Sequence, residues 1–167
     1  MIAARSRDTR PRNRKPDQEY AMPELDIEWA QTWYNLWHLA LAYLFALPVA
    51  LDREASSRSA GLRTFPLVAI AACGYTLVGF SILGTTDAEA RVLQGVITGI
   101  GFIGGGAILK SRGSVAGTAT AASIWTTGLI GIAVAADRFE IALILSIMTF
   151  ATLRVGRQIK EKLPDSE

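Results

Sequence analysis

Long apolar stretches separated by short polar connections dominate the chain after about residue 30. Each stretch is long enough to cross the hydrocarbon core of a bilayer as a helix, although the last one needs Phe139 and snorkelling Arg154 and Arg157 to reach both interfaces. The pattern therefore predicts an all-α polytopic membrane protein, a bundle of five transmembrane helices. The predicted spans are residues 33–51, 66–83, 92–109, 118–136 and 139–155.

Glycine is concentrated in the third apolar stretch, although it is a poor helix former in water. In a bilayer every backbone amide must be bonded within the segment, so a helix is forced, and small residues let neighbouring backbones approach closely. We therefore expect the bundle to pack through this glycine-rich third helix. The glycines expected to pack helices together are Gly95, Gly99, Gly101, Gly104, Gly105, Gly106, Gly117, Gly128 and Gly131.

Charged residues divide the chain into three regions. Residues 1–30 hold an arginine-rich block followed by acids and show no apolar period, which is typical of a disordered charged tail. We favour a solvated tail over one that binds lipid headgroups or nucleic acid. Residues 31–156 form the transmembrane domain, and 157–167 form a short basic cytoplasmic tail. A cleavable signal peptide is the alternative for the first stretch, but about thirty polar residues precede it, so we expect a retained helix.

The distribution of lysine and arginine predicts the orientation. Basic residues flank the first-to-second connection, the third-to-fourth connection and the C-terminal end, so these segments belong in the cytoplasm. The two remaining connections are short and rich in acids, and they should face outward. The N terminus is then outside and the C terminus is cytoplasmic. The basic residues are Arg53, Arg58, Arg63, Lys110, Arg112, Arg154, Arg157, Lys160 and Lys162.

Two polar clusters lie at the predicted membrane boundaries. The first joins Asp52-Arg53-Glu54 to the segment 60–64, where Thr64 is near a helix N-cap and Pro66 suits a first turn; a structural lock and a functional site are equally good interpretations. The second is Asp87, Arg91 and Gln94, where helix capping and pairing with Arg91 are favoured over binding of a cation. Asp87 and Glu54 are weak candidate ligands for Mg²⁺, a hard cation that prefers oxygen.

Hydroxyl side chains recur along the fourth stretch. Thr120, Ser123 and Thr127 share a helix face, which indicates interhelical hydrogen bonding or, as the sharper alternative, a polar path through the bundle. In the first stretch His38 and Asn35 interrupt the apolar run, and we expect structural hydrogen bonds inside the bundle. The single cysteine, Cys73, should be a buried packing residue.

Enzyme chemistry finds little support in the sequence. There are one histidine and one cysteine, and no histidine–glutamate motif with metal-binding spacing. The segment 99–104 matches G-x-G-x-x-G, but the strand and the downstream acidic residue that a dinucleotide site requires are missing. We expect a protein that is not an enzyme and needs no cofactor, with Mg²⁺ the one ion to consider.

Five blocks in a characteristic order give the chain a family resemblance. They are Asp52-Arg53-Glu54, Ala60-Gly61-Leu62-Arg63-Thr64, residues 91–94, residues 99–106 and residues 117–125. In these blocks, over roughly residues 36–155, the chain resembles the MgtC/SapB family. The resemblance implies a small bacterial inner-membrane protein associated with magnesium homeostasis, stress or acid tolerance and, in pathogens, virulence. Longer members carry a cytoplasmic domain after the fifth helix, so we expect a short form here.

Two functions follow as hypotheses. The first is a non-catalytic regulator whose cytoplasmic clusters contact another membrane complex, such as a transporter or a proton-translocating ATP synthase. The second is a magnesium or other cation transporter or channel, completed by a homo-oligomer. We expect a homo-oligomer in the lipid bilayer and no nucleic acid. The candidate functional residues are Arg53, Glu54, Arg63, Thr64, Asp87, Arg91, Gln94, Lys110, Thr118, Thr120, Ser123 and Trp125.

Overall fold

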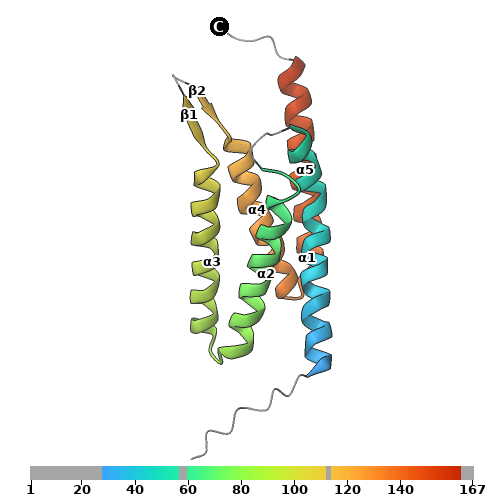
Figure 1. The fold of residues 1–167 in the computed structure, drawn as a ribbon, viewed down its shortest axis with the longest axis vertical. Helices are drawn as coiled ribbons and strands as arrows, with labels where there is room; N and C mark the ends of the chain where they lie inside the picture. The colour runs from blue at the N-terminus through green and yellow to red at the C-terminus, as the bar shows by residue number, and fades with distance from the viewer. Residues whose placement is uncertain (1–27, 57–59, 112–113, 163–167) are drawn as a thin grey trace, which may run out of the picture.

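A computed structural model of the chain describes residues 28–56, 60–111 and 114–162. Over these ranges the chain forms five α-helices and one short antiparallel hairpin (Figure 1). The predicted all-α bundle is confirmed, and the hairpin between the third and fourth helices is an addition to it. The elements are α1 (Trp29–Ser56), α2 (Thr64–Ile82), α3 (Thr86–Gly106), β1 (Leu109–Ser111), β2 (Ser114–Ala116), α4 (Thr118–Ala135) and α5 (Phe139–Lys162).

Most of the helices are longer than the apolar stretches that predict them. Helix α1 begins four residues before 33 and ends five after 51, and α5 continues to Lys162 through residues expected to form a tail. Arg, Lys, Glu and Gln are good helix formers, so a helix does not stop where its apolar run stops. The third helix instead ends early, at Gly106, because the chain continues into β1 at Leu109.

Four of the helices, α1, α2, α4 and α5, are long and apolar enough to cross a membrane. Helix α3 lies beside them, but its first turns carry Asp87, Glu89 and Arg91. The chain is thus a multi-pass membrane protein, and the fifth predicted span remains a prediction.

The helices run alternately up and down, so the charged side chains are sorted to two ends. Helix α4 packs against all four others, while α3 lies at one edge and packs mainly against α4 and α2 (Figure 1). The acidic end, as we call it, has the N-terminal ends of α1, α3 and α5, with Asp87, Glu89, Asp137 and Glu140. The basic end has the C-terminal ends of α1 and α5, with Arg53, Arg63, Arg154, Arg157, Lys160 and Lys162.

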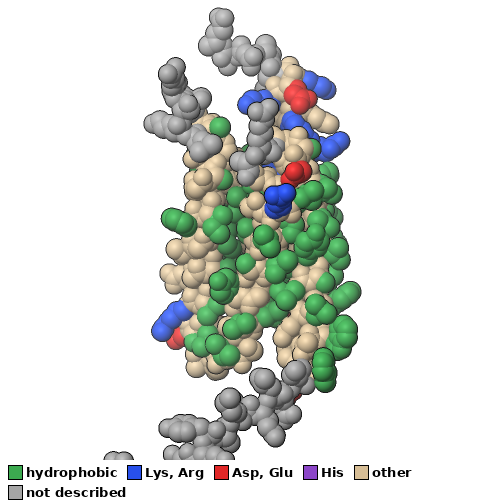
Figure 2. Space-filling model, in the orientation of Figure 1, with side chains coloured by type: hydrophobic (Ala, Val, Ile, Leu, Met, Phe, Trp, Pro, Cys, Tyr) green, Lys and Arg blue, Asp and Glu red, His purple; other side chains and the backbone are tan. Residues whose placement is uncertain are grey.

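Many interior side chains are small, and many large apolar side chains lie on the outside. The core between α1, α2 and α4 includes Ala42, Ala46 and Ala69, all fully buried, whereas Leu67 and Ile144 are exposed. Figure 2 shows hydrophobic side chains along the flank of the bundle and basic ones at the tip of α5. This distribution suits a lipid surround, because hydrocarbon tails solvate large apolar side chains and small residues permit close helix packing. On α1 an exposed stripe is formed by Trp29, Trp33 and Trp37.

The predicted packing glycines fall into two groups. Gly104 faces the carbonyl oxygen of Ala121 on α4; an added Cβ there would lie 3.1 Å from that oxygen. Gly128 and Gly131 let α4 approach Ile100 of α3 and the backbone of α2 more closely still. Gly117 has a φ of 87° and forms the turn before α4. The second group meets no atom of the described chain within 4 Å of an added Cβ: Gly95, Gly99, Gly101, Gly105 and Gly106.

Candidate functional site

A fully buried carboxylate joins two helices at the basic end. Asp52 lies near the end of α1, and its side chain has no exposed surface. Oδ2 accepts a hydrogen bond of 2.7 Å from Nη2 of Arg53, and Oδ1 accepts one of 2.8 Å from Nη2 of Arg157 on α5. Arg157 also donates to the hydroxyl of Ser56. The contact therefore links residues of the first and the last helix.

The arginine beside Asp52 is itself buried. The side chain of Arg53 is 9% exposed, and its Nε has no hydrogen-bond partner among the described residues. A buried guanidinium is tolerated only when it is paired, so Arg53 depends on the carboxylate of Asp52. Together Asp52, Arg53 and Arg157 form a closed charge cluster, with its charges directed at one another.

The loop between α1 and α2 is fastened to the end of α1. The carboxylate of Glu54 accepts the backbone N–H of Leu62 at 2.8 Å. Gly61 is required there, because a Cβ would collide with the Glu54 carboxylate and lie 2.9 Å from its Cα. The carbonyl of Gly61 in turn accepts the N–H groups of Thr64 and Phe65, at 3.0 and 3.1 Å. The loop geometry is thus specified, as the structural-lock interpretation expects.

The remaining candidates of this segment lie at the start of α2. Arg63 occupies the N-cap position and is exposed, and Thr64 is the first helical residue. Pro66 is in the first turn, as the sequence indicates. Glu54 and Arg63 therefore present their side chains at the surface of the basic end, next to the buried cluster.

The second predicted cluster is open. Asp87, Arg91 and Gln94 are exposed on α3, and among the ion pairs of the described residues Asp87 and Arg91 do not pair. The cap of α3 is Thr85, whose hydroxyl accepts the N–H of Ala88 at 3.3 Å. Asp87 instead lies in the first turn, where a negative charge favours the helix dipole.

The two weak metal candidates lie at opposite ends of the bundle. Asp87 is in the first turn of α3 at the acidic end, and Glu54 is near the end of α1 at the basic end. They therefore cannot bind one ion together. Within the described residues, no group of three or more His, Cys, Asp or Glu side chains is placed to hold a metal ion.

The hydroxyl face of α4 is turned into the bundle. Thr120, Ser123 and Thr127 are all buried, as their spacing predicts. Ser123 donates to the carbonyl of Ala119 at 2.6 Å, whereas the hydroxyl of Thr127 has no hydrogen-bond partner within the described part of the chain. The other candidates are outside this face: Thr118 and Trp125 are exposed, and Lys110 lies in β1, with a side chain that is not among those described.

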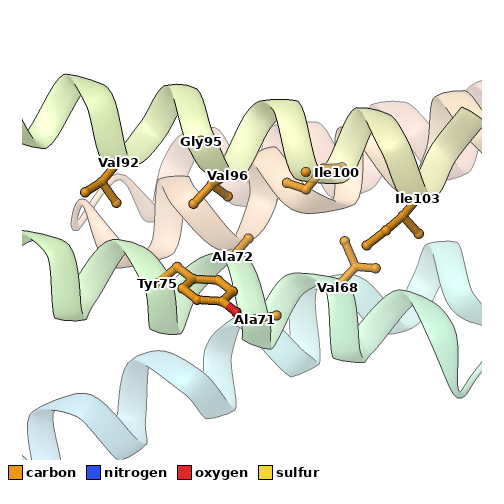
Figure 3. Close-up of a pocket in the computed structure, with 10 residues that line it drawn as sticks. Val68, Ala71, Ala72, Tyr75, Val92, Gly95, Val96, Ile100 and Ile103 are labelled. Atoms are coloured by element: carbon orange, nitrogen blue, oxygen red, sulfur yellow. The ribbon is translucent and has the colours of Figure 1, made fainter.

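An apolar cleft opens between α2 and α3. It has a volume of about 470 Å³, and Figure 3 shows its lining, with Ala71 and Tyr75 of α2 on one side and Gly95 and Val96 of α3 on the other. A second cavity of about 300 Å³ lies between α4 and α5, with Ser123 and Thr126 on one wall and Thr149 and Thr152 on the other. Neither is lined by Asp87 or Glu54.

A third polar group, at the acidic end, includes a partner that the sequence did not reveal. His38 is 2% exposed, and its Nε2 lies 2.8 Å from Oδ1 of Asp137 in the α4–α5 turn. The hydroxyl of Tyr34 donates to Oδ2 of Asp137, also at 2.8 Å. The hydrogen bond from His38, and next the one from Tyr34, hold the pKa of Asp137 below its ordinary value. His38 thus faces inward as expected, while Asn35 accepts from Gln31 outside.

Comparison with known proteins agrees with this architecture. Residues 39–162 match the model of the MgtC family. The chain is 35% identical to the protein SrpB of Synechococcus elongatus over 72% of this chain and 74% of that protein. It is 32% identical to the putative magnesium transporter YhiD of Escherichia coli K12, over 75% and 61%. No solved structure matches.

A further relative is the protein MgtC of Brucella abortus, which is 34% identical over 75% of this chain and 52% of that protein. The chain thus spans between about half and three quarters of the length of these relatives. The matched region contains α2, α3, α4 and α5 entire and most of α1, including the charge cluster at Asp52. The chain therefore belongs to the MgtC family.

Proposed function

We propose that this protein is a non-catalytic regulator of another membrane complex in the bacterial inner membrane, and that it acts in magnesium and stress homeostasis. The observation that carries the proposal is the closed charge cluster. Asp52 has no exposed side-chain surface, and both of its oxygens are used by Arg53 and Arg157. A carboxylate that guides an ion across a membrane needs access to water, and this one has none.

The surface next to the cluster supplies a place for contact. Glu54, Leu62 and Arg63 are exposed at the basic end, on a loop whose backbone is fixed by the Glu54 hydrogen bond and by Gly61. A fixed loop loses little conformational entropy on binding, which favours recognition. We place this end in the cytoplasm, because lysine and arginine gather there, and the C terminus with it. The N terminus, by the same rule, is outside.

The proposal includes α3 as a fifth membrane helix. Its five open glycines leave no side chain to shield the backbone, and small residues of this kind let another helix approach closely. We propose that the face with Gly101 and Gly105, which lie four residues apart, packs against a second copy, which would give the homo-oligomer and the glycine-mediated packing that the sequence predicts.

Flux measurements test the proposal directly. The purified protein is placed in liposomes with magnesium-sensitive and pH-sensitive dyes inside, and gradients of each ion are imposed. The expected result is no flux above that of empty liposomes. Flux that is lost in the Asp87→Ala, Glu54→Ala double variant would overturn the proposal and establish transport.

Photo-crosslinking in cells tests the contact. A photoreactive residue at position 63 is compared with one at position 87, which is exposed at the opposite end. The expected result is a crosslink to a transporter or ATP-synthase subunit from position 63 and not from position 87. Equal crosslinking from both positions would contradict a contact through the basic end.

Cation transport is the second candidate. The observation that favours it is Thr127, which shares a face with Thr120 and Ser123 and whose buried hydroxyl finds no hydrogen-bond partner in the described residues. The name of the relative YhiD, a putative magnesium transporter, points the same way. Against it stand the burial of this face and the separation of Asp87 from Glu54. Cysteine accessibility at positions 98, 120 and 127 distinguishes the two, because a water-filled path requires reaction at 120 and 127.

A further inference from the structure

Both ring nitrogens of His38 face oxygen acceptors. Nδ1 lies 2.8 Å from the backbone carbonyl oxygen of Tyr34, and Nε2 lies 2.8 Å from Oδ1 of Asp137. A neutral imidazole carries a single N–H, whereas an imidazolium carries two. Both contacts can be hydrogen bonds only if His38 and Asp137 together hold one proton more than a neutral imidazole and an ionised carboxylate do. The ring is 2% exposed, so water has little access to its nitrogens, whereas the side chain of Asp137 is 59% exposed.

The backbone at Asp137 shows that the carboxylate is held at a cost. Helix α4 ends with hydrogen bonds from Arg138 N to Ala133 O at 2.9 Å and from Asp137 N to Val134 O at 3.1 Å. This is the Schellman arrangement, in which glycine usually occupies the left-handed position. Here Asp137 occupies it, with φ of 57°. A side chain placed where glycine fits better indicates a use for that side chain.

The groups around the ring leave Asp137 as its charge partner. Tyr34 of α1 donates its hydroxyl to the other oxygen of Asp137, and α5 contributes the ring of Phe139, 5.5 Å from that of His38. Arg138 is paired with Glu140 at 2.6 Å and is exposed. From α2 the titratable group on this side is the buried thiol of Cys73. In the described part of the chain, Asp137 is the one carboxylate bonded to His38.

We propose that His38 and Asp137 form a proton-operated latch that holds the α4–α5 turn against α1. With the imidazolium present, the ring donates to both Tyr34 and Asp137, and the latch is closed. When the ring loses a proton, one nitrogen lone pair faces an oxygen lone pair at 2.8 Å, so the ring or the turn must move. The latch therefore closes when the pair takes up a proton and opens when it releases one. The inference goes beyond the proposed regulator role and does not require it.

Nitrogen NMR tests the protonation. The chain has one histidine, so ¹⁵N-histidine labelling of the full chain in lipid nanodiscs gives the signals of His38 alone. The expected result is two N–H groups that exchange slowly with water at an acidic pH, and a single N–H at an alkaline pH. A ring with a single N–H at both pH values would overturn the proposal.

Hydrogen exchange tests the mechanical consequence. After correction for intrinsic rates, the backbone amides of residues 137–142 should be about tenfold better protected at the acidic pH, the effect of one charge-assisted hydrogen bond. In Asp137→Gly, which suits the left-handed backbone, this pH difference should vanish; Asp137→Asn should reduce it. Asp87→Asn, an exposed carboxylate at the same end, is the matched control and should keep it. An unchanged pH difference in Asp137→Gly would defeat the latch.

Discussion

Arg157, in the last part of α5, donates a hydrogen bond of 2.8 Å to Asp52, near the end of α1, across 105 positions of sequence. The carboxylate is fully buried, and Arg53 uses its other oxygen. Taking charges out of water is costly, so a buried ion pair adds little net stability compared with a pair of apolar residues in its place. Removal of one partner, however, leaves the other charge buried without a counter-charge. At the basic end, α1 and α5 are therefore joined by a buried contact in which the carboxylate pairs with the two guanidinium groups.

Replacing Asp52 with alanine should be strongly destabilising. Arg53 would remain buried without a counter-charge, at a cost of about 3–5 kcal/mol. Arg157→Ala should cost less, because that side chain is 30% exposed and Arg53 still pairs with Asp52. Unfolding in mixed detergent micelles measures both changes, with Asp87→Ala as an exposed control. Equal loss in the Asp52 and Arg157 variants would argue against this ranking.

Gly61→Ala should loosen the loop between α1 and α2. The new methyl group would overlap Glu54 and force the loop away, at a cost of about 1–3 kcal/mol. Gly105→Ala is the contrast, because an added methyl group meets nothing within 4 Å of that position and alanine is the better helix former. Proteolysis of the loop in intact vesicles measures the effect. Similar cleavage of both variants would contradict the assigned role of Gly61.

The two leucine substitutions in α3 should separate folding from self-association. Gly104→Leu places a side chain where the carbonyl oxygen of Ala121 lies 3.1 Å from an added Cβ, so α3 should be pushed off α4 and thermal stability should fall. Gly101→Leu meets open space within the chain, so stability should be retained while the proposed contact with a second copy is lost. Melting temperature and crosslinked-dimer yield report the two effects. If Gly101→Leu still dimerises normally, the glycine face is not the interface.

Protonation of Asp137 in strong acid should weaken its contact with His38 and lower the stability of the fold. The folded state lowers the pKa of Asp137 below its ordinary value of 3.8, so the ionised carboxylate stabilises the fold fully above that value. This contribution is lost as the pH falls from 3.8 through the lower pKa of the folded state. Melting temperatures at decreasing pH should therefore show an acid decline that is smaller in Asp137→Asn. An identical decline in both proteins would exclude Asp137 as its source.

The helices were predictable, because burial in lipid imposes long apolar runs that the sequence displays directly. The bounds of the helices were less predictable than their existence. Helix α5 continues through Arg154 and Lys160, where good helix formers extend the helix beyond the apolar run. The hairpin was not predicted, since Leu109, Lys110 and Ser111 are too few to give a strand pattern. Local propensity marks the middle of an element better than its ends.

The polar contacts were predictable only in part. The block Asp52-Arg53-Glu54 drew attention by its composition, but nothing local identifies Arg157 as the partner of Asp52. The same holds for His38 and Asp137, 99 positions apart, although a histidine in an apolar span indicates that some polar partner exists. The glycines are visible in the sequence, but which of them contact another helix is not. Gly104 and Gly105 are neighbours in sequence, yet helical geometry points Gly104 at α4 and Gly105 away from the bundle.

The link between α1 and α5 also dictates an order of events during synthesis. Helix α1 enters the bilayer first, and its buried carboxylate then has Arg53 but not Arg157, which leaves the ribosome about a hundred residues later. Until α5 is inserted, the terminal charges of α1 must stay in water or be shielded by the insertion machinery. Helix α5 thus supplies the second counter-charge of Asp52 on α1. Ribosomal arrest before α5 should therefore leave α1 shifted toward the aqueous side and open to degradation.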